Sequence, residues 1–75
     1  MKEEILNLLE QNLPLVDFDS EFLYSELDSL GIANILLILS DKYNIELDYS
    51  DVTPKNFKNI DNLTQLVRSK LDIES

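Results

Sequence analysis

The sequence contains no cysteine, no histidine and no tryptophan, and it has a single glycine and two prolines. Without cysteine the chain can form no disulfide and offers no thiolate to a metal. Without histidine it lacks the commonest general base, the usual zinc ligand and every Ser-His catalytic arrangement. An enzyme built here would depend on carboxylates, lysines and tyrosines. We therefore predict that the protein is not an enzyme and has no metal site.

Basic residues are scarce as well. Six lysines and arginines face fifteen aspartates and glutamates, which gives a net charge of −9, and no basic residue lies between Lys2 and Lys42. Such a surface repels nucleic-acid phosphates and anionic membranes, so we expect neither as a partner. A basic protein surface is its natural complement, although a solvated acidic face that serves solubility alone would have the same composition.

Long apolar runs are missing too. The longest spans residues 35–39, far short of the roughly 20 residues that a membrane-spanning helix needs. The N-terminal segment is acidic and amphipathic, unlike a secretory signal. We therefore expect no membrane insertion and a soluble, cytoplasmic monomer. The length of 75 residues fits a single domain, residues 1–75, in which we expect 72–75 to be a frayed tail.

What the chain does contain is apolar residues at helical spacing. They predict three long helices, over about residues 2–13, 29–43 and 61–71. Pro14 ends the first helix, because the residue before a proline avoids the helical conformation. Asp28 and Asp61 are expected to cap the second and third helices. Asn44 ends the second, since asparagine tolerates the left-handed backbone of a helix C-terminus.

The segments between these helices are of two kinds. Residues 14–28 follow no single period, so we predict a long loop whose apolar residues fold back on the core; these are Leu15, Val16, Phe18, Phe22, Leu23 and Leu27. Thr53 and Pro54 predict a short helix that reaches about Phe57. The expected fold is all-α, an antiparallel bundle of three long helices plus one short helix with a long first loop.

The most informative residues are Asp28, Ser29 and Leu30, at the junction between the long loop and the second long helix. This triplet resembles the attachment motif of acyl carrier proteins, in which the serine hydroxyl takes 4′-phosphopantetheine from coenzyme A. The resemblance extends along the chain to residues 21–23, 41–47 and 53–57. It is strongest to stand-alone carriers of specialised acyl or aminoacyl groups.

Elementary physics favours the same placement. A serine at a helix N-terminus lies beside unpaired N–H groups and the positive end of the helix dipole, which suits a phosphodiester. A separate transferase with Mg²⁺ would supply the activation, and Asp28 could help to hold that metal. On the other hand, Asp followed by Ser is also ordinary helix capping, and the triplet alone is common.

Three positions depart from the family pattern. Glu26 replaces a glycine that is usual two residues before the aspartate, and Asn44 replaces the turn glycine after the second helix. Asn34 stands five residues after the serine, where fatty-acid carriers tend to have glutamate, and this helix has no acid before Asp41. The resemblance therefore implies a specialised carrier whose partners depend less on charge at this helix.

The function that the resemblance implies is a carrier holding acyl or aminoacyl groups as thioesters on an arm attached to Ser29. Its partners would be a phosphopantetheinyl transferase and the enzymes that load and process the cargo. Leu30, Ala33 and Leu37 lie off the core face and, with Asp41, are candidate partner contacts, although marginal core packing is the alternative. Fatty, polyketide, D-alanyl and other aminoacyl cargoes remain open. The competing hypothesis is a non-covalent acidic adaptor that binds a basic protein surface.

We predict that moderate NaCl, or millimolar Mg²⁺ or Ca²⁺, raises the melting temperature. The acids at positions 17, 19, 21, 26 and 28 have no basic residue between them in the sequence, so screening or ion binding should relieve their repulsion. Thermal unfolding followed by circular dichroism across both titrations measures the effect. A flat melting temperature would mean that these acids do not repel one another appreciably in the fold.

Overall fold

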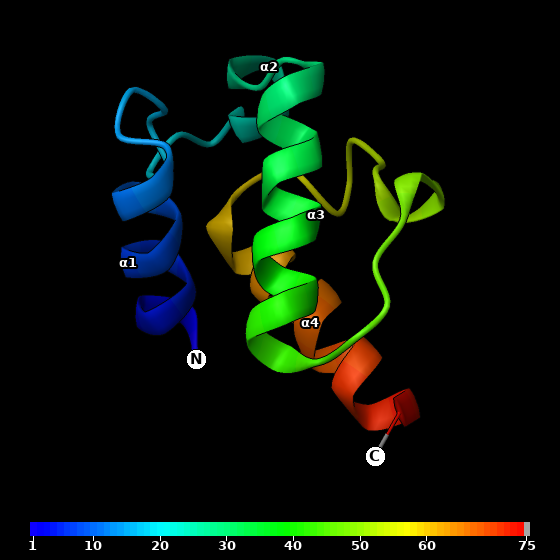
Figure 1. The fold of residues 1–75 in the computed structure, drawn as a ribbon. Coiled ribbons are helices and arrows are strands. Elements are labelled where there is room, and N and C mark those ends of the chain that lie inside the picture. The colour runs from blue at the N-terminus through cyan, green and yellow to red at the C-terminus, as the bar shows by residue number, and fades with distance from the viewer. Residues whose placement is uncertain (75) are drawn as a thin grey trace.

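The computed structural model describes residues 1–74, and they contain helices and no strand, which confirms the all-α class (Figure 1). In chain order the elements are α1 (Lys2–Asn12), α2 (Leu23–Glu26), α3 (Ser29–Tyr43), the 3-10 helix η1 (Tyr49–Asp51) and α4 (Ile60–Glu74). None of these helices is long and apolar enough to cross a membrane within the described residues.

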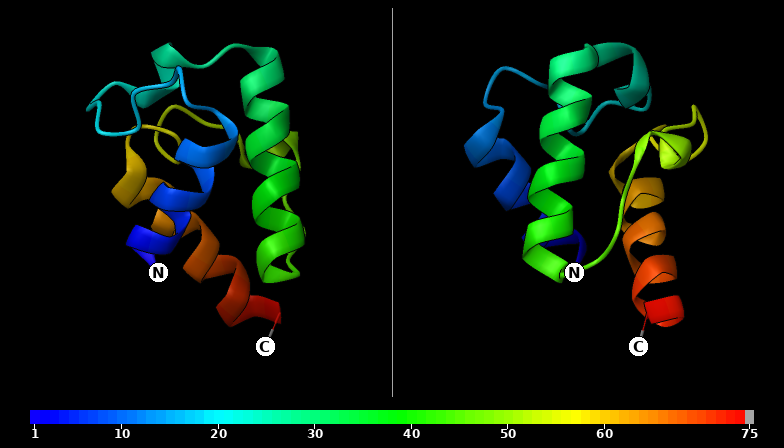
Figure 2. Two further views of the ribbon diagram at one scale, coloured as in Figure 1. Left: turned by 60° about the vertical axis from the view of Figure 1, so that its left-hand side comes forward. Right: turned by 45° about the vertical axis from the view of Figure 1, so that its right-hand side comes forward.

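The three long helices pack against one another in all three pairs. α1 runs in one direction, and α3 and α4 both run back in roughly the opposite one (Figures 1 and 2). The start of α1 therefore lies near the end of α3. The short helix α2 and the first residue of α3 lie together at the other end of the molecule.

The core is built from one face of each long helix together with residues from the connecting segments. Spacings of three and four place these side chains on one stripe per helix, as predicted. The buried apolar residues are Ile5, Leu9, Phe18, Leu23, Ile35, Leu36, Leu39, Ile45, Phe57, Ile60, Leu63, Leu66 and Val67. Since Phe18, Ile45 and Phe57 come from outside the long helices, the connections are held against the core rather than free of it.

Both ends of α3 lie where the sequence placed them. At the start, Asp28 Oδ1 accepts a hydrogen bond of 2.7 Å from the Gly31 N–H, the bond of an N-cap. At the end, Asn44 has φ 52° and ψ 50°, the left-handed conformation that stops a helix. The N–H groups of Asn44 and Ile45 both donate to the Ser40 carbonyl, which satisfies an acceptor in the last turn.

A hydrogen bond between side chains ties α1 to the last turn of α3. The Tyr43 hydroxyl donates to Glu4 Oε1 over 2.5 Å, joining residues 39 positions apart. Partial burial, with the Glu4 carboxylate beside it, raises the pKa of Tyr43 to about 12. The same hydrogen bond, helped by the charge of Lys42, lowers the pKa of Glu4. The pair fixes the register of the two helices at the end away from Ser29.

The first loop differs from the prediction in two respects. Residues 23–26 form α2, which the sequence did not reveal because one helical turn is too short to show a period. Phe18 and Leu23 are buried as expected, but Leu15 is 99% and Phe22 73% exposed. The expectation that the loop folds all of its apolar residues onto the core was therefore wrong.

The second connection also differs. Residues 54–57 form a turn rather than a helix, although the Thr53 hydroxyl does cap it by accepting the Asn56 N–H over 3.0 Å. The short helix of this connection is η1, which begins after Asp48, whose side chain accepts from the Ser50 N–H. Thr53 and Pro54 therefore indicated a real turn, but the short helix of this connection lies a few residues earlier than we predicted from them.

The last helix begins one residue earlier than predicted and ends later. Asn59, not Asp61, provides the cap, because its side-chain oxygen accepts the Asn62 N–H over 2.8 Å. The Asp61 carboxylate instead pairs with Lys2 over 2.9 Å. α4 continues to Glu74, three residues beyond the predicted end at Leu71. The frayed tail expected over residues 72–75 stays a prediction, and Ser75 lies outside the described residues.

We predict that Leu39→Ala costs about 2–5 kcal/mol of unfolding free energy, because Leu39 is fully buried and its truncation leaves a cavity. Leu37 is the matched control, two residues away on α3 and 69% exposed. Leu37→Ala should change the unfolding free energy by no more than about 0.5 kcal/mol. Urea unfolding of both variants measures this, and equal costs would contradict the face assignment of α3.

We also predict that Tyr43 titrates late and that its titration depends on Glu4. The folded pKa of Tyr43 is raised from 10.0 to about 12, so its contribution to stability is complete below pH 10 and is lost as the pH rises toward 12. The ultraviolet absorbance of tyrosinate should therefore show a step near pH 12 that is missing in Tyr43→Phe. Glu4→Gln should shift this step to lower pH, and an unchanged step would mean that the hydrogen bond does not form.

Candidate functional site

Ser29 is the first residue of α3, and its side chain is exposed. The chain reaches it in an extended conformation at Asp28, with φ −97° and ψ 179°, and turns into the helix there. The start of α3 therefore lies at the end of the molecule that α2 and the first loop also occupy (Figure 1). Another protein can reach it without displacing any part of the core.

The backbone N–H groups in the first turn of α3 are of two kinds: one is hydrogen-bonded to a side chain, and the others have no acceptor within the helix. Asp28 takes the N–H of Gly31, whereas the N–H groups of Ser29 and Leu30 have no acceptor within the helix. Together with the helix dipole they favour a negatively charged group on the Ser29 oxygen. The donor set thus fits a phosphodiester at this serine.

Gly31 has a place in this arrangement that the sequence did not suggest. A Cβ on Gly31 would lie 3.2 Å from Asp28 Oδ1 and 3.5 Å from a methyl carbon of Leu27. The first of these distances is tighter than an ordinary van der Waals contact, so the absence of a side chain leaves room for the cap. The one feature of the sequence that could have indicated this role is that its only glycine stands three residues after the capping Asp28.

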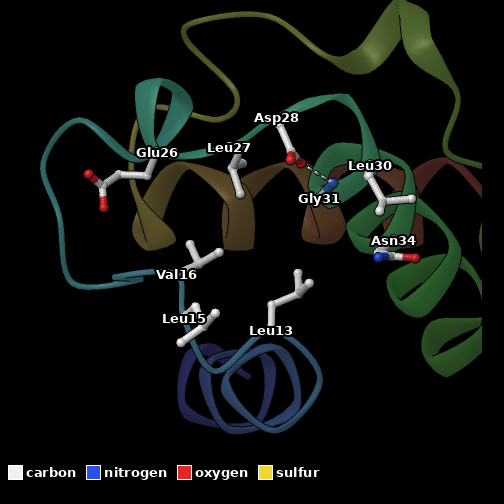
Figure 3. A pocket seen from close by; sticks show the side chains of 9 residues that line it. All are labelled: Leu13, Leu15, Val16, Glu26, Leu27, Asp28, Leu30, Gly31 and Asn34. Carbon is white, nitrogen blue, oxygen red and sulfur yellow. Dashed lines mark hydrogen bonds between the residues drawn. The ribbon is translucent and has the colours of Figure 1, made fainter.

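A hollow of about 330 Å³ lies beside this helix start (Figure 3). Its walls come from the segment after α1, the segment before α3 and the first turns of α3 itself. The lining residues are Leu13, Leu15, Val16, Glu26, Leu27, Asp28, Leu30, Gly31 and Asn34. The apolar side chains face one another across the hollow, and Asp28 and Glu26 stand at its rim (Figure 3).

A second hollow, also of about 330 Å³, lies along α3 between the helix and the segment that carries η1. It is lined by Ala33, Leu36, Leu37, Ser40, Leu47, Asp48 and Tyr49. α3 contributes to both hollows from different sides, so its exposed face is a ridge with a concave surface on either flank.

The four candidate partner contacts do not all border the same hollow. Leu30 and Leu37, 70% and 69% exposed, are two helical turns apart and so lie nearly in line on the ridge. Leu30 lines the hollow beside the helix start, whereas Ala33 and Leu37 line the second one. Asp41 is exposed but borders neither. Marginal core packing is therefore wrong for Leu30 and Leu37, which lie on an exposed ridge.

The acidic side chains near the site are all exposed, and α1 supplies a base that their own segment lacks. Lys2 pairs with Asp61, which is the main cause of its raised pKa, and Asp19 and Glu21 lie close enough to raise that pKa further. This neighbour reduces the repulsion expected from the sequence. Within residues 1–74, no three acidic side chains are placed to hold a metal ion together.

Comparison with protein-family models, with curated proteins and with solved structures gives no match for this chain. The interpretation of Ser29 therefore rests on the residues of this chain and on their arrangement.

We predict that Asp28→Ala lowers the unfolding free energy by about 0.5–2 kcal/mol, because the Gly31 N–H loses its side-chain acceptor. Asp28→Asn keeps an oxygen that can accept this bond and should remain close to the parent protein. Urea unfolding of the two variants separates the cap from the charge. If Asp28→Asn is as costly as Asp28→Ala, the hydrogen bond is not what stabilises the helix start.

Proposed function

We propose that the protein is a carrier that holds acyl or aminoacyl groups as thioesters on a 4′-phosphopantetheine arm attached to Ser29. The observation that carries the proposal is the position of Ser29, exposed at the first residue of α3 and directly after the capping Asp28. The same triplet gave the resemblance to acyl carrier proteins, and the all-helical fold with three long helices supports the proposal.

The chemistry of attachment requires little from the chain itself. The Ser29 oxygen would form a bond to the phosphorus that carries pantetheine, while the pyrophosphate bond of coenzyme A breaks and adenosine 3′,5′-bisphosphate leaves. A phosphopantetheinyl transferase with Mg²⁺ would take the hydroxyl proton and stabilise the leaving group. The chain contributes an accessible oxygen and first-turn N–H groups that favour the phosphate.

The arm would supply the thiol that the chain lacks, since the sequence has no cysteine. On this proposal the protein is not an enzyme: it presents the thioester, and separate cytoplasmic enzymes load, modify and remove the cargo. The Leu30–Leu37 ridge, with Ala33 and Asp41 near it, is the surface that such enzymes would contact. Its apolar character agrees with partners that depend less on charge at α3.

A specific observation keeps the adaptor as the second candidate. The net charge of −9 and the exposed apolar ridge would also suit non-covalent docking on a basic protein. The two candidates differ in one respect: only the carrier needs the Ser29 hydroxyl.

We predict that Ser29 accepts a phosphopantetheine group. The folded protein is incubated with coenzyme A, Mg²⁺ and a broad-specificity phosphopantetheinyl transferase, and intact and peptide masses are measured. The expected result is one phosphopantetheinyl group on the peptide that contains Ser29, with none on Ser29→Ala. Asp28→Asn shows whether the transferase needs the carboxylate.

Failure with several transferases, on protein shown by circular dichroism to be folded, would reject the carrier and leave the adaptor. Modification at another serine would reject the assignment of Ser29.

A further inference from the structure

A third hollow, which shares no residue with the two beside α3, lies over α2. It holds about 330 Å³ and is lined by Glu21, Phe22, Tyr24, Ser25, Pro54 and Lys58; we call it the α2 groove. Phe22 is 73% exposed, which is unusual for a large aromatic side chain because its contact with water is unfavourable. The core does not use this ring.

The backbone holds Phe22 in place although its ring is exposed. Its N–H donates to Ser20 Oγ over 2.9 Å, and its carbonyl accepts from the Ser25 hydroxyl over 2.8 Å. The next residue, Leu23, is fully buried, and its N–H donates to the Lys58 carbonyl over 2.9 Å. A ring on so fixed a backbone loses less conformational freedom on binding, and aromatic side chains of this kind often dominate interfaces.

The charges around the α2 groove indicate the chemistry of a partner. Glu21 and Lys58 belong to its lining, and Asp19 lies close to Lys2, as Glu21 does. Lys2 is already paired with Asp61. Within the lining itself one carboxylate, Glu21, is balanced by one ammonium group, Lys58. The acidic excess belongs to the molecule as a whole, whose net charge of −9 attracts a basic partner and opposes a second copy of the same chain.

We propose that the α2 groove is a docking surface for a segment of a basic partner protein. That segment places an apolar side chain against Phe22 and Tyr24 and a lysine or arginine beside Asp19 and Glu21. The surface does not include Ser29 or the ridge of α3, and the proposal does not depend on whether Ser29 is modified.

Two synthetic peptides with one central apolar sequence test the proposal, one flanked by arginines and the other by glutamates. They are titrated into full-length Ser29→Ala, so that attachment chemistry cannot contribute, and backbone amide shifts are followed by nuclear magnetic resonance. The arginine peptide should shift the amides of Ser20, Leu23, Ser25 and Lys58. Added salt should weaken its binding, and the glutamate peptide should bind at least about tenfold more weakly.

Two variants of the same protein locate the contact. Phe22→Ser should lower the affinity for the arginine peptide by about tenfold or more, as expected for a central aromatic contact. The matched control is Tyr49→Ser, which removes another exposed aromatic ring away from the α2 groove and should leave the affinity unchanged. Glu21→Lys leaves the Phe22 ring in place and should also weaken binding of the arginine peptide. It replaces Phe22→Ser as the test if that variant does not fold.

The proposal is overturned if the arginine peptide causes no shifts, if its shifts map to the Leu30–Leu37 ridge, or if both peptides bind equally. It is also overturned if sedimentation shows a dimer of the protein that Phe22→Ser dissociates, because a second copy is then the occupant.

Discussion

α3 has to bury one face in a small core and at the same time leave its first residue and its opposite face open to solvent. Ile35 and Leu39 meet the first requirement, because they are fully buried on a helix that packs against both α1 and α4. Asp28 meets the second by taking up a first-turn donor with its own side chain, so the helix can begin without a covering element. If α3 were buried all round, neither the exposed serine nor the ridge would exist.

The connection before α3 is anchored at few points, and those points decide what its other residues present. Phe18 and Leu23 reach the core, and one backbone bond from Leu23 to Lys58 ties the connection to the segment before α4. Leu15, which precedes Phe18, and Phe22, which lies between the two anchors, are both exposed and contribute to different hollows. A loop held in this way can offer apolar surface without being disordered, because its anchors offset the cost of ordering it.

The end of the molecule that carries Ser29 therefore has several separate features. The serine and the hollow beside it lie at the start of α3, the ridge follows the helix, and the α2 groove shares no lining residue with the two hollows beside α3. A protein that has to meet more than one partner benefits from such separation, since one surface can stay engaged while another is released. The acidic charge over this end adds long-range attraction for basic partners, which acts mainly on the rate of encounter.

Local signals in the sequence were enough to predict the three long helices and the position of Ser29. Pro14, Asp28 and Asn44 each act on the backbone within one turn, so the ends of α1 and α3 could be inferred from neighbours in the chain. The stripe that contains Ile35 and Leu39 followed from helical spacing alone. What the sequence could not show was which apolar residues outside the helices would find a place in the core: Leu23 did, whereas Leu15 and Phe22 did not. Nor could it show that Tyr43 meets Glu4, or that Lys2 comes close to Glu21, since these pairs are distant in the chain. Capping and periodicity are properties of a single turn or helix, whereas exposure and long-range pairing depend on the surface that the other helices leave uncovered.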